Sequence, residues 1–261
     1  MTVPFALTLT SLGLVGAFIA GLLGVGGAIV MVPLLLYVPP LLGLGQLDMK
    51  AVAGITMVQV LVAAASGVVA HYRMHAVHRE LSWVGGPAMA AGSFAGAVLS
   101  HLLGGRALLL VFALMATAAI GVLLVPVEMA GAPVFAERVR IPRGRAVAVC
   151  ALVGIAAGLI GAGGAFLLVP LLITAVGVPI RVAIGSSLAI TAVSAVTGFL
   201  GKAVTGQIPW GPAAFVALGA VPGAQLGALV SRRLPATRLR FALLATVLLT
   251  ATRVWWDVLY P

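Results

Sequence analysis

Carboxylates are scarce in this chain, where five Asp and Glu stand against 15 Lys and Arg in 261 residues. An enzyme that uses paired acid–base groups needs carboxylates inside its site, and so does a carboxylate proton relay within a membrane. The five lie outside or at the edges of the long apolar segments, at Asp48, Glu80, Glu128, Glu137 and Asp257. A G-x-x-x-x-G-K-[ST] nucleotide loop is also missing. The sequence therefore predicts a protein that is not an enzyme and does not hydrolyse ATP by that route.

Cysteine is represented once, by Cys150 in an apolar run. A single thiol excludes an internal disulfide and offers no metal-ligand spacing. Histidines cluster in HYRMHAVH (71–78), but this motif contains no acidic or cysteine companion. We therefore expect no metal site and no cofactor.

Charge of either sign is missing from three intervals, residues 1–47, 146–180 and 203–231. Each is longer than the roughly 20 residues that span the hydrocarbon of a bilayer. A cleaved signal peptide is the alternative for the first interval, but no Lys or Arg precedes it and its apolar character continues too far. The net charge of +10 comes from short Arg clusters between apolar segments, so we expect lipid headgroups rather than nucleic acid as their partners.

Glycine is abundant, and one glycine-rich stretch occurs twice. GLLGVGGAIVMVPLL (21–35) returns as GLIGAGGAFLLVPLL (158–172) with ten of fifteen letters unchanged. Later landmarks recur in the same order: Trp83 with Trp210, and FALMAT (112–117) with FALLAT (241–246). Residues 126–145 hold three Pro and six charges, as expected of a linker. We predict two homologous transmembrane repeats, 1–125 and 146–261, joined by the linker 126–145.

Each repeat is predicted to contain a glycine-tipped, broken or re-entrant helix hairpin followed by three transmembrane helices. The expected segments are 4–20, 27–44, 50–72, 82–103 and 106–125, then 145–160, 164–177, 181–201, 208–230 and 237–256. If 145–177 enters and leaves on one side, 11 of the 15 basic residues gather on that side, as the positive-inside rule favours. A simple span there removes the bias. The first hairpin is inferred only by similarity. An odd number of crossings per half then predicts an all-α polytopic membrane protein with an inverted repeat.

The repeated glycine turn offers free backbone N–H groups at the start of a helix, where the helix dipole favours an anion. The alternative is that these glycines only let helices pack closely. The predicted substrate-binding glycines are Gly24, Gly26 and Gly27 in the first turn and Gly161, Gly163 and Gly164 in the second.

Polar side chains follow each turn, and five of them are predicted to bind substrate: Thr56, Gln59, Ser186, Ser187 and Thr191. A hydroxyl can instead bond a carbonyl of its own helix, so the glutamines, Gln59 and Gln225, are the stronger candidates. His71, Arg73 and Lys202 lie at span ends and are predicted, with Gln225, to attract or gate an anion; ordinary interfacial positions are the alternative.

The duplicated glycine turn followed by V-P, the G-[IS]-[TS] start of the next span, and the openings W-G-G-P and W-G-P-A resemble the TauE/SafE sulfite exporter family over residues 10–256. The resemblance implies a multi-pass transporter of the bacterial inner membrane for sulfite or small organosulfur and organic anions, driven by protons or another ion gradient. The first half departs from the pattern, with G-I-T where the second has G-S-S, so no hydroxyl is present at Ile55.

The resulting hypothesis is export of sulfite or a related small anion by alternating access. Transport of another small solute, such as an amino acid or a metal ion, is one alternative, and a non-transporting membrane scaffold is another. A metal cargo would favour carboxylate or thiolate ligands, which are rare here. The sequence leaves the direction of transport, the coupling ion and the oligomeric state open.

Overall fold

The computed structural model describes residues 2–23, 27–72, 77–124, 141–231, 233–234 and 236–259. Every regular element in this part of the chain is a helix. The first half comprises α1 (Val3–Leu23), α2 (Ala28–Leu41), α3 (Met49–Tyr72), α4 (Arg79–Leu99), a 3₁₀ turn (Ser100–Leu102) and α5 (Gly105–Leu124).

The second half repeats this order of helices. It comprises α6 (Arg143–Ile160), α7 (Ala165–Leu171) with a π-helical continuation (Leu172–Val176), α8 (Ile180–Val204), α9 (Trp210–Ser231) and α10 (Ala236–Leu259). The expected segments therefore match the helices to within a few residues. The all-helical prediction is confirmed for the described part of the chain.

Seven described helices are long and apolar enough to cross a membrane: α1, α3, α5, α6, α8, α9 and α10. The helices that follow the glycine turns, α2 and α7, are shorter. α4 has 21 residues but is not among the seven; glycine, alanine and serine make up about half of its sequence. The chain is thus a multi-pass membrane protein whose shortest helices are those that begin at the glycine turns.

Two helix pairs make the most extensive contacts, α1 with α9 and α4 with α6. In both pairs, glycines of each helix face backbone carbonyls of the other, so the two backbones approach closely. In α1–α9 these glycines are Gly13, Gly21, Gly219, Gly223 and Gly227; in α4–α6 they are Gly92, Gly96, Gly154 and Gly158. These helical glycines therefore serve close helix packing, which is the alternative role considered above for the glycines of the turns.

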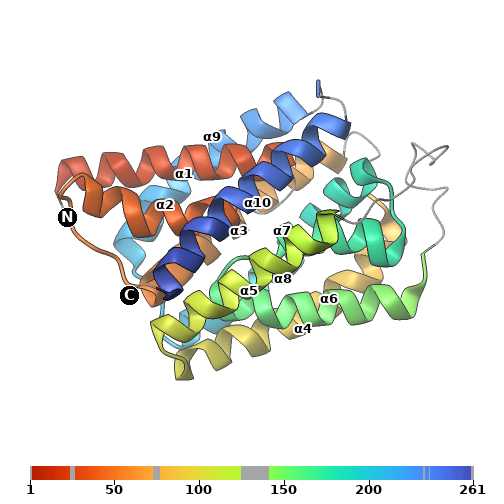
Figure 1. The fold of residues 1–261 in the computed structure, drawn as a ribbon, viewed down its shortest axis with the longest axis horizontal. Helices are drawn as coiled ribbons and strands as arrows, with labels where there is room; N and C mark the ends of the chain where they lie inside the picture. Colours follow the sequence, from red (N-terminus) through yellow and green to blue (C-terminus); the bar gives the residue numbers. More distant parts are fainter. Residues whose placement is uncertain are drawn as a thin grey trace.

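The remaining helices complete two groups that meet in the middle of the molecule. α3 contacts α8 and α9, and α8 contacts α3 and α4, so α3 and α8 form the centre of the bundle. In Figure 1, α1 starts and α10 ends at the same end of the long axis, whereas α6 starts at the opposite end. Gly27 lies against α3, and the second glycine turn lies against α3 and α8.

Candidate functional site

The second glycine turn is a buried break between α6 and α7. α6 ends at Gly161, and Gly161, Gly163 and Gly164 all have positive φ, between 61° and 70°. Non-glycine residues rarely adopt this conformation. All four residues from 161 to 164 are buried. The repeated G-x-G-G motif is therefore required by the backbone of this turn.

This turn packs between the two central helices. Gly161 lies against the backbone carbonyl of Ala53 in α3. A Cβ atom at Gly163 would overlap Val60 of α3 and lie 3.0 Å from Thr191 Cγ2 of α8. Thr191 Oγ1 donates a long, 3.4 Å hydrogen bond to the Gly163 carbonyl. Thr191 is thus the predicted hydroxyl that the structure brings to a glycine turn.

Of the first turn, the structure describes Gly27, while Gly24 and Gly26 lie outside the described residues. Gly27 has φ 79° and its carbonyl accepts hydrogen bonds from Val30 and Met31 at the start of α2. Gly164, at the same place in the repeat, accepts equivalent bonds from Leu167 and Leu168 in α7. The repeated sequence therefore builds the same local structure at these two positions.

Gln59 lies beside the first turn. A Cβ atom at Gly27 would be 2.7 Å from Gln59 Nε2. Because Gln59 and Val60 are consecutive in α3, the first turn contacts one residue and the second turn contacts the next. One turn of α3 therefore brings the two glycine motifs, 137 positions apart in the sequence, to the same level of the bundle.

The Gln59 side chain is fully buried, and neither its amide nitrogen nor its amide oxygen has a hydrogen-bond partner among the residues that the structure describes. Leaving a buried polar group unpaired costs about 1–3 kcal/mol. Such a group in a native structure calls for an explanation, and a bound molecule is one. The hydroxyls of Ser93 in α4 and Ser194 in α8 are likewise buried and have no partner within the described part of the chain.

Three other predicted residues bond helix backbone. Thr56 Oγ1 donates to the Val52 carbonyl at 2.9 Å, and Ser187 Oγ donates to the Ile184 carbonyl at 2.8 Å. Ser186 Oγ accepts a bond from the backbone N–H of His78, at the start of α4. All three are buried. Thr56 and Ser187 thus follow the alternative in which a hydroxyl bonds its own helix.

Lys202 is fully buried at the end of α8. Its Nζ donates to Ser100 Oγ at 2.8 Å, to Gln207 Oε1 at 3.1 Å and to the Leu159 carbonyl at 3.4 Å. The ion pairs of the described residues join Arg143 with Glu80 and Arg253 with Asp257, so the Lys202 ammonium faces neutral oxygens rather than a carboxylate. Because Leu159 lies two residues before Gly161, this charge is next to the second turn.

The remaining predicted residues lie elsewhere. Gln225 is exposed on α9, between the glycines that pack on α1. Arg73 and the side chain of His71 lie outside the described part. Sequence reasoning missed Ser100 and Gln207, the partners of Lys202; the signal available was a glutamine directly after an apolar span.

The architecture defines a class: a multi-pass membrane protein whose described elements are all helices, with a buried glycine turn between α6 and α7. Comparison places the chain within that class. A family model described as "Sulfite exporter TauE/SafE" matches residues 9–254, so the chain belongs to this family, as the motifs indicated.

Relatives with printed names agree with this placement. A "Probable membrane transporter protein" of Xylella fastidiosa is 35% identical over 237 residues, which cover 88% of this chain and 86% of that protein. The "Probable membrane transporter protein YunE" of Bacillus subtilis is 26% identical over 87% of this chain and 88% of its own length. No solved structure matches. Family and names together indicate a membrane transporter rather than an enzyme.

Proposed function

We propose that this protein is a secondary transporter that exports sulfite, or a related small sulfur-containing or organic anion, across the bacterial inner membrane by alternating access. The observation that carries the proposal is the buried, unpartnered amide of Gln59 beside the first glycine turn. Its family and the names of its relatives support transport. The anion itself is argued from the chemistry of the surrounding groups.

Donors dominate the groups that would face a substrate. The Gln59 Nε2 group and the free N–H groups at the start of α2 would donate to an oxyanion from the first turn, which includes Gly24, Gly26 and Gly27. Thr191 and the backbone of Gly161, Gly163 and Gly164 would form the opposite wall. Three further hydroxyls, those of Thr56 in α3 and of Ser186 and Ser187 in α8, would line the site at the same level. They could bond a substrate only after giving up their present hydrogen bonds to backbone groups.

Positive potential would come from Lys202. Its ammonium is buried among neutral oxygens, so a nearby anion would offset part of its desolvation cost. Protons or another ion would supply the driving force. Because intramembrane carboxylates are scarce, the substrate itself or a histidine would have to carry the protons. His71 and Arg73 stay predicted gating residues of this proposal, in which Gln225, exposed on α9, takes no part in gating.

Alternating access would follow from two groups of helices that move relative to each other. The close glycine contacts would hold α1 with α9 and α4 with α6, so each moving group would combine the hairpin of one repeat with the second of the three spans of the other. The opposite starting ends of α1 and α6 support an inverted arrangement of the repeats (Figure 1). Both turns would lie where the two groups meet.

Purified protein in liposomes tests the proposal. We expect sulfite flux under an imposed proton or ion gradient, and a flux at least tenfold lower for Gln59→Leu. Met89→Leu serves as the control because Met89 packs on the second turn without a polar contact. A panel of sulfate, sulfite and small sulfonates identifies the cargo. Flux equal to that of empty liposomes for every anion of the panel would contradict anion transport.

A further inference from the structure

A pocket with a volume of about 630 Å³ lies between α1, α2 and α10, outside the proposed anion site. Ile19, Leu34 and Tyr37 form its wall on α1 and α2, and Leu249, Arg253 and Trp256 form its wall on α10. Its volume falls within the range of about 300–1,000 Å³ typical of small-molecule sites. The pocket is therefore large enough for a flexible apolar chain.

The lining of the pocket is apolar even at its threonine positions. The hydroxyls of three lining threonines bond backbone carbonyls: Thr246 that of Ala242, Thr250 that of Ile29 and Thr252 that of Leu249. Their methyl groups are thus the parts that remain for packing. Positions 246 to 256 extend about 15 Å along the helix axis. Length and polarity both fit an acyl chain.

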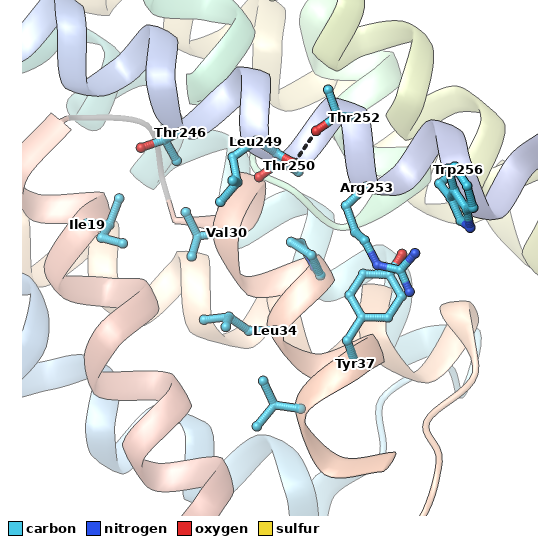
Figure 2. A pocket seen from close by; sticks show the side chains of 12 residues that line it. Ile19, Val30, Leu34, Tyr37, Thr246, Leu249, Thr250, Thr252, Arg253 and Trp256 are labelled. Atoms are coloured by element: carbon cyan, nitrogen blue, oxygen red, sulfur yellow. Dashed lines mark hydrogen bonds between the residues drawn. The ribbon is translucent and has the colours of Figure 1, made fainter. Parts of the chain in front are cut away.

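One end of the pocket is charged. Figure 2 shows the Arg253 guanidinium over the Tyr37 ring, with Ile19 and Thr246 at the far end. The guanidinium carbon lies 4.3 Å from the ring centroid, and one nitrogen pairs with Asp257 at 3.0 Å. The Tyr37 hydroxyl also donates to Asp257. Because the Arg253 side chain is half exposed, its remaining N–H donors are available to a ligand.

The pocket opens on the outer surface of α10, a helix long and apolar enough to span the membrane. Leu249 is 75% exposed and Trp256 is 60% exposed, and both belong to the candidate span Phe241–Leu259. Arg253 lies six residues before the end of α10, about 9 Å along the axis. Arg and Trp near a span end are typical of the headgroup level of a bilayer. The apolar part of the pocket then faces hydrocarbon.

The arginine and the tyrosine of the charged end are not part of the repeat. In the alignment of the two halves, Tyr37 corresponds to Thr174 and Arg253 corresponds to Leu124. A feature needed only to build the fold would be expected in both copies. The difference therefore indicates a function confined to the α2–α10 side.

We infer that this pocket binds one phospholipid, with an acyl chain along α10 and the headgroup phosphate at Arg253. A phosphodiester carries one negative charge. It would accept hydrogen bonds from the Arg253 N–H groups that are not paired with Asp257, the carboxylate to which the Tyr37 hydroxyl also donates. The bound chain would also touch the segment where Thr250 holds the Ile29 carbonyl, two residues after Gly27. Lipid occupancy would thereby favour one position of α2.

Native mass spectrometry of the detergent-purified chain, titrated with phosphatidylglycerol, tests this inference. We expect one tightly retained lipid per chain and about tenfold weaker retention for Arg253→Gln, which removes a charge-assisted hydrogen bond. Arg106→Gln, an exposed arginine at the start of α5, should bind as the wild type does. Leu34→Trp should fill the pocket and abolish retention, whereas Leu171→Trp, its counterpart in the second half, should not. Free glycerol phosphate should not compete, because it lacks the acyl chain.

The same experiments can overturn the inference. Wild-type lipid retention by Leu34→Trp, or by Arg253→Gln, would exclude this pocket as the lipid site. A second copy of the chain is the other occupant to examine, with Leu249→Cys in a Cys150→Ala background. Efficient disulfide-linked dimers in lipid would show that this face is an interface between copies and would refute lipid binding there.

Discussion

Gly27 and Gly164, the last glycines of the two turns, share a positive φ but differ in one of their three nearest neighbours. A Cβ atom at Gly27 would meet Gly16 and Ala20 of its own hairpin, and one at Gly164 would meet Val153 and Ala157 at the corresponding positions. Beyond these pairs the copies diverge. The Cβ atom added at Gly27 would lie 2.7 Å from the amide nitrogen of Gln59, whereas the one added at Gly164 would lie 3.0 Å from the methyl group of Met89.

The difference separates what the repeat conserves from what it changes. Positive φ and close packing recur at Gly27 and Gly164, so they belong to the fold. The polar side chains alternate instead: α3 has Gln59 followed by Val60, and the corresponding positions of α8 hold Ile190 and Thr191. The second turn therefore meets the apolar Val60 of α3 and the polar Thr191 of α8, whereas Gly27 of the first turn meets the polar Gln59 of α3. An asymmetric ligand site can arise in this way from a duplicated frame.

The largest expected effect is loss of the folded protein on Gly161→Val. The substitution combines a positive φ, which costs about 1–3 kcal/mol for a residue with Cβ, with overlap at the Ala53 carbonyl. Gly177→Val has a similar φ of 80° but no atom within 4 Å of the added Cβ, so it should be much milder. Thermal unfolding monitored by size-exclusion chromatography compares the two. Equal stability of both variants would show that the close contact at Ala53 is unimportant.

Gln59→Leu should separate stability from transport. Leucine has nearly the same volume, and it removes an unsatisfied amide that costs about 1–3 kcal/mol, so the midpoint of unfolding should stay or rise. Sulfite flux should nevertheless fall at least tenfold. Loss of stability together with unchanged flux would assign Gln59 to the core and refute its role at the turn.

Helix positions could be predicted from the sequence because their signals are local. The expected segment 50–72 is α3, Met49–Tyr72, and 145–160 is α6, Arg143–Ile160. Both are bounded by charge, Pro or Gly, which mark where the chain leaves hydrocarbon. The glycine turns also carry their own signal, since positive φ demands glycine. Helix and turn are thus encoded within a few neighbouring residues.

Contacts between distant segments could not be predicted in the same way. Gln59 and Gly27 meet only because α3 packs on the first hairpin, and Ser100 and Gln207 reach Lys202 only when the ends of α4 and α8 meet. Hydroxyls are ambiguous because a backbone carbonyl is always in reach, as the bonds of Thr56 and Ser187 show. Residue type therefore suggested candidates, while tertiary packing decided which of them lie at a turn.

Lys202→Met should weaken substrate affinity rather than stability. Methionine retains most of the buried stem and removes an ammonium whose partners are neutral oxygens. If the charge attracts the anion at the second turn, the KM for sulfite should rise about tenfold. Lys50→Met is the matched control, since Lys50 lies at the same end of the bundle and bonds an exposed carbonyl, that of His101. A changed unfolding midpoint with an unchanged KM would make Lys202 purely structural.

The smallest effect is expected for Gln225, the glutamine that α9 places on the outer face. Exposed substitutions away from special contacts change stability by at most about 0.5 kcal/mol. Gln225→Leu should therefore leave both sulfite flux and the unfolding midpoint near wild type, in contrast to Gln59→Leu. The variants Gln59→Leu and Gln225→Leu together test whether a glutamine must be buried beside a glycine turn to affect transport, or whether any glutamine within a span does so. Equal losses of flux in both variants would favour a gating role for Gln225 on the surface of α9. The transport path would then extend beyond the two glycine turns.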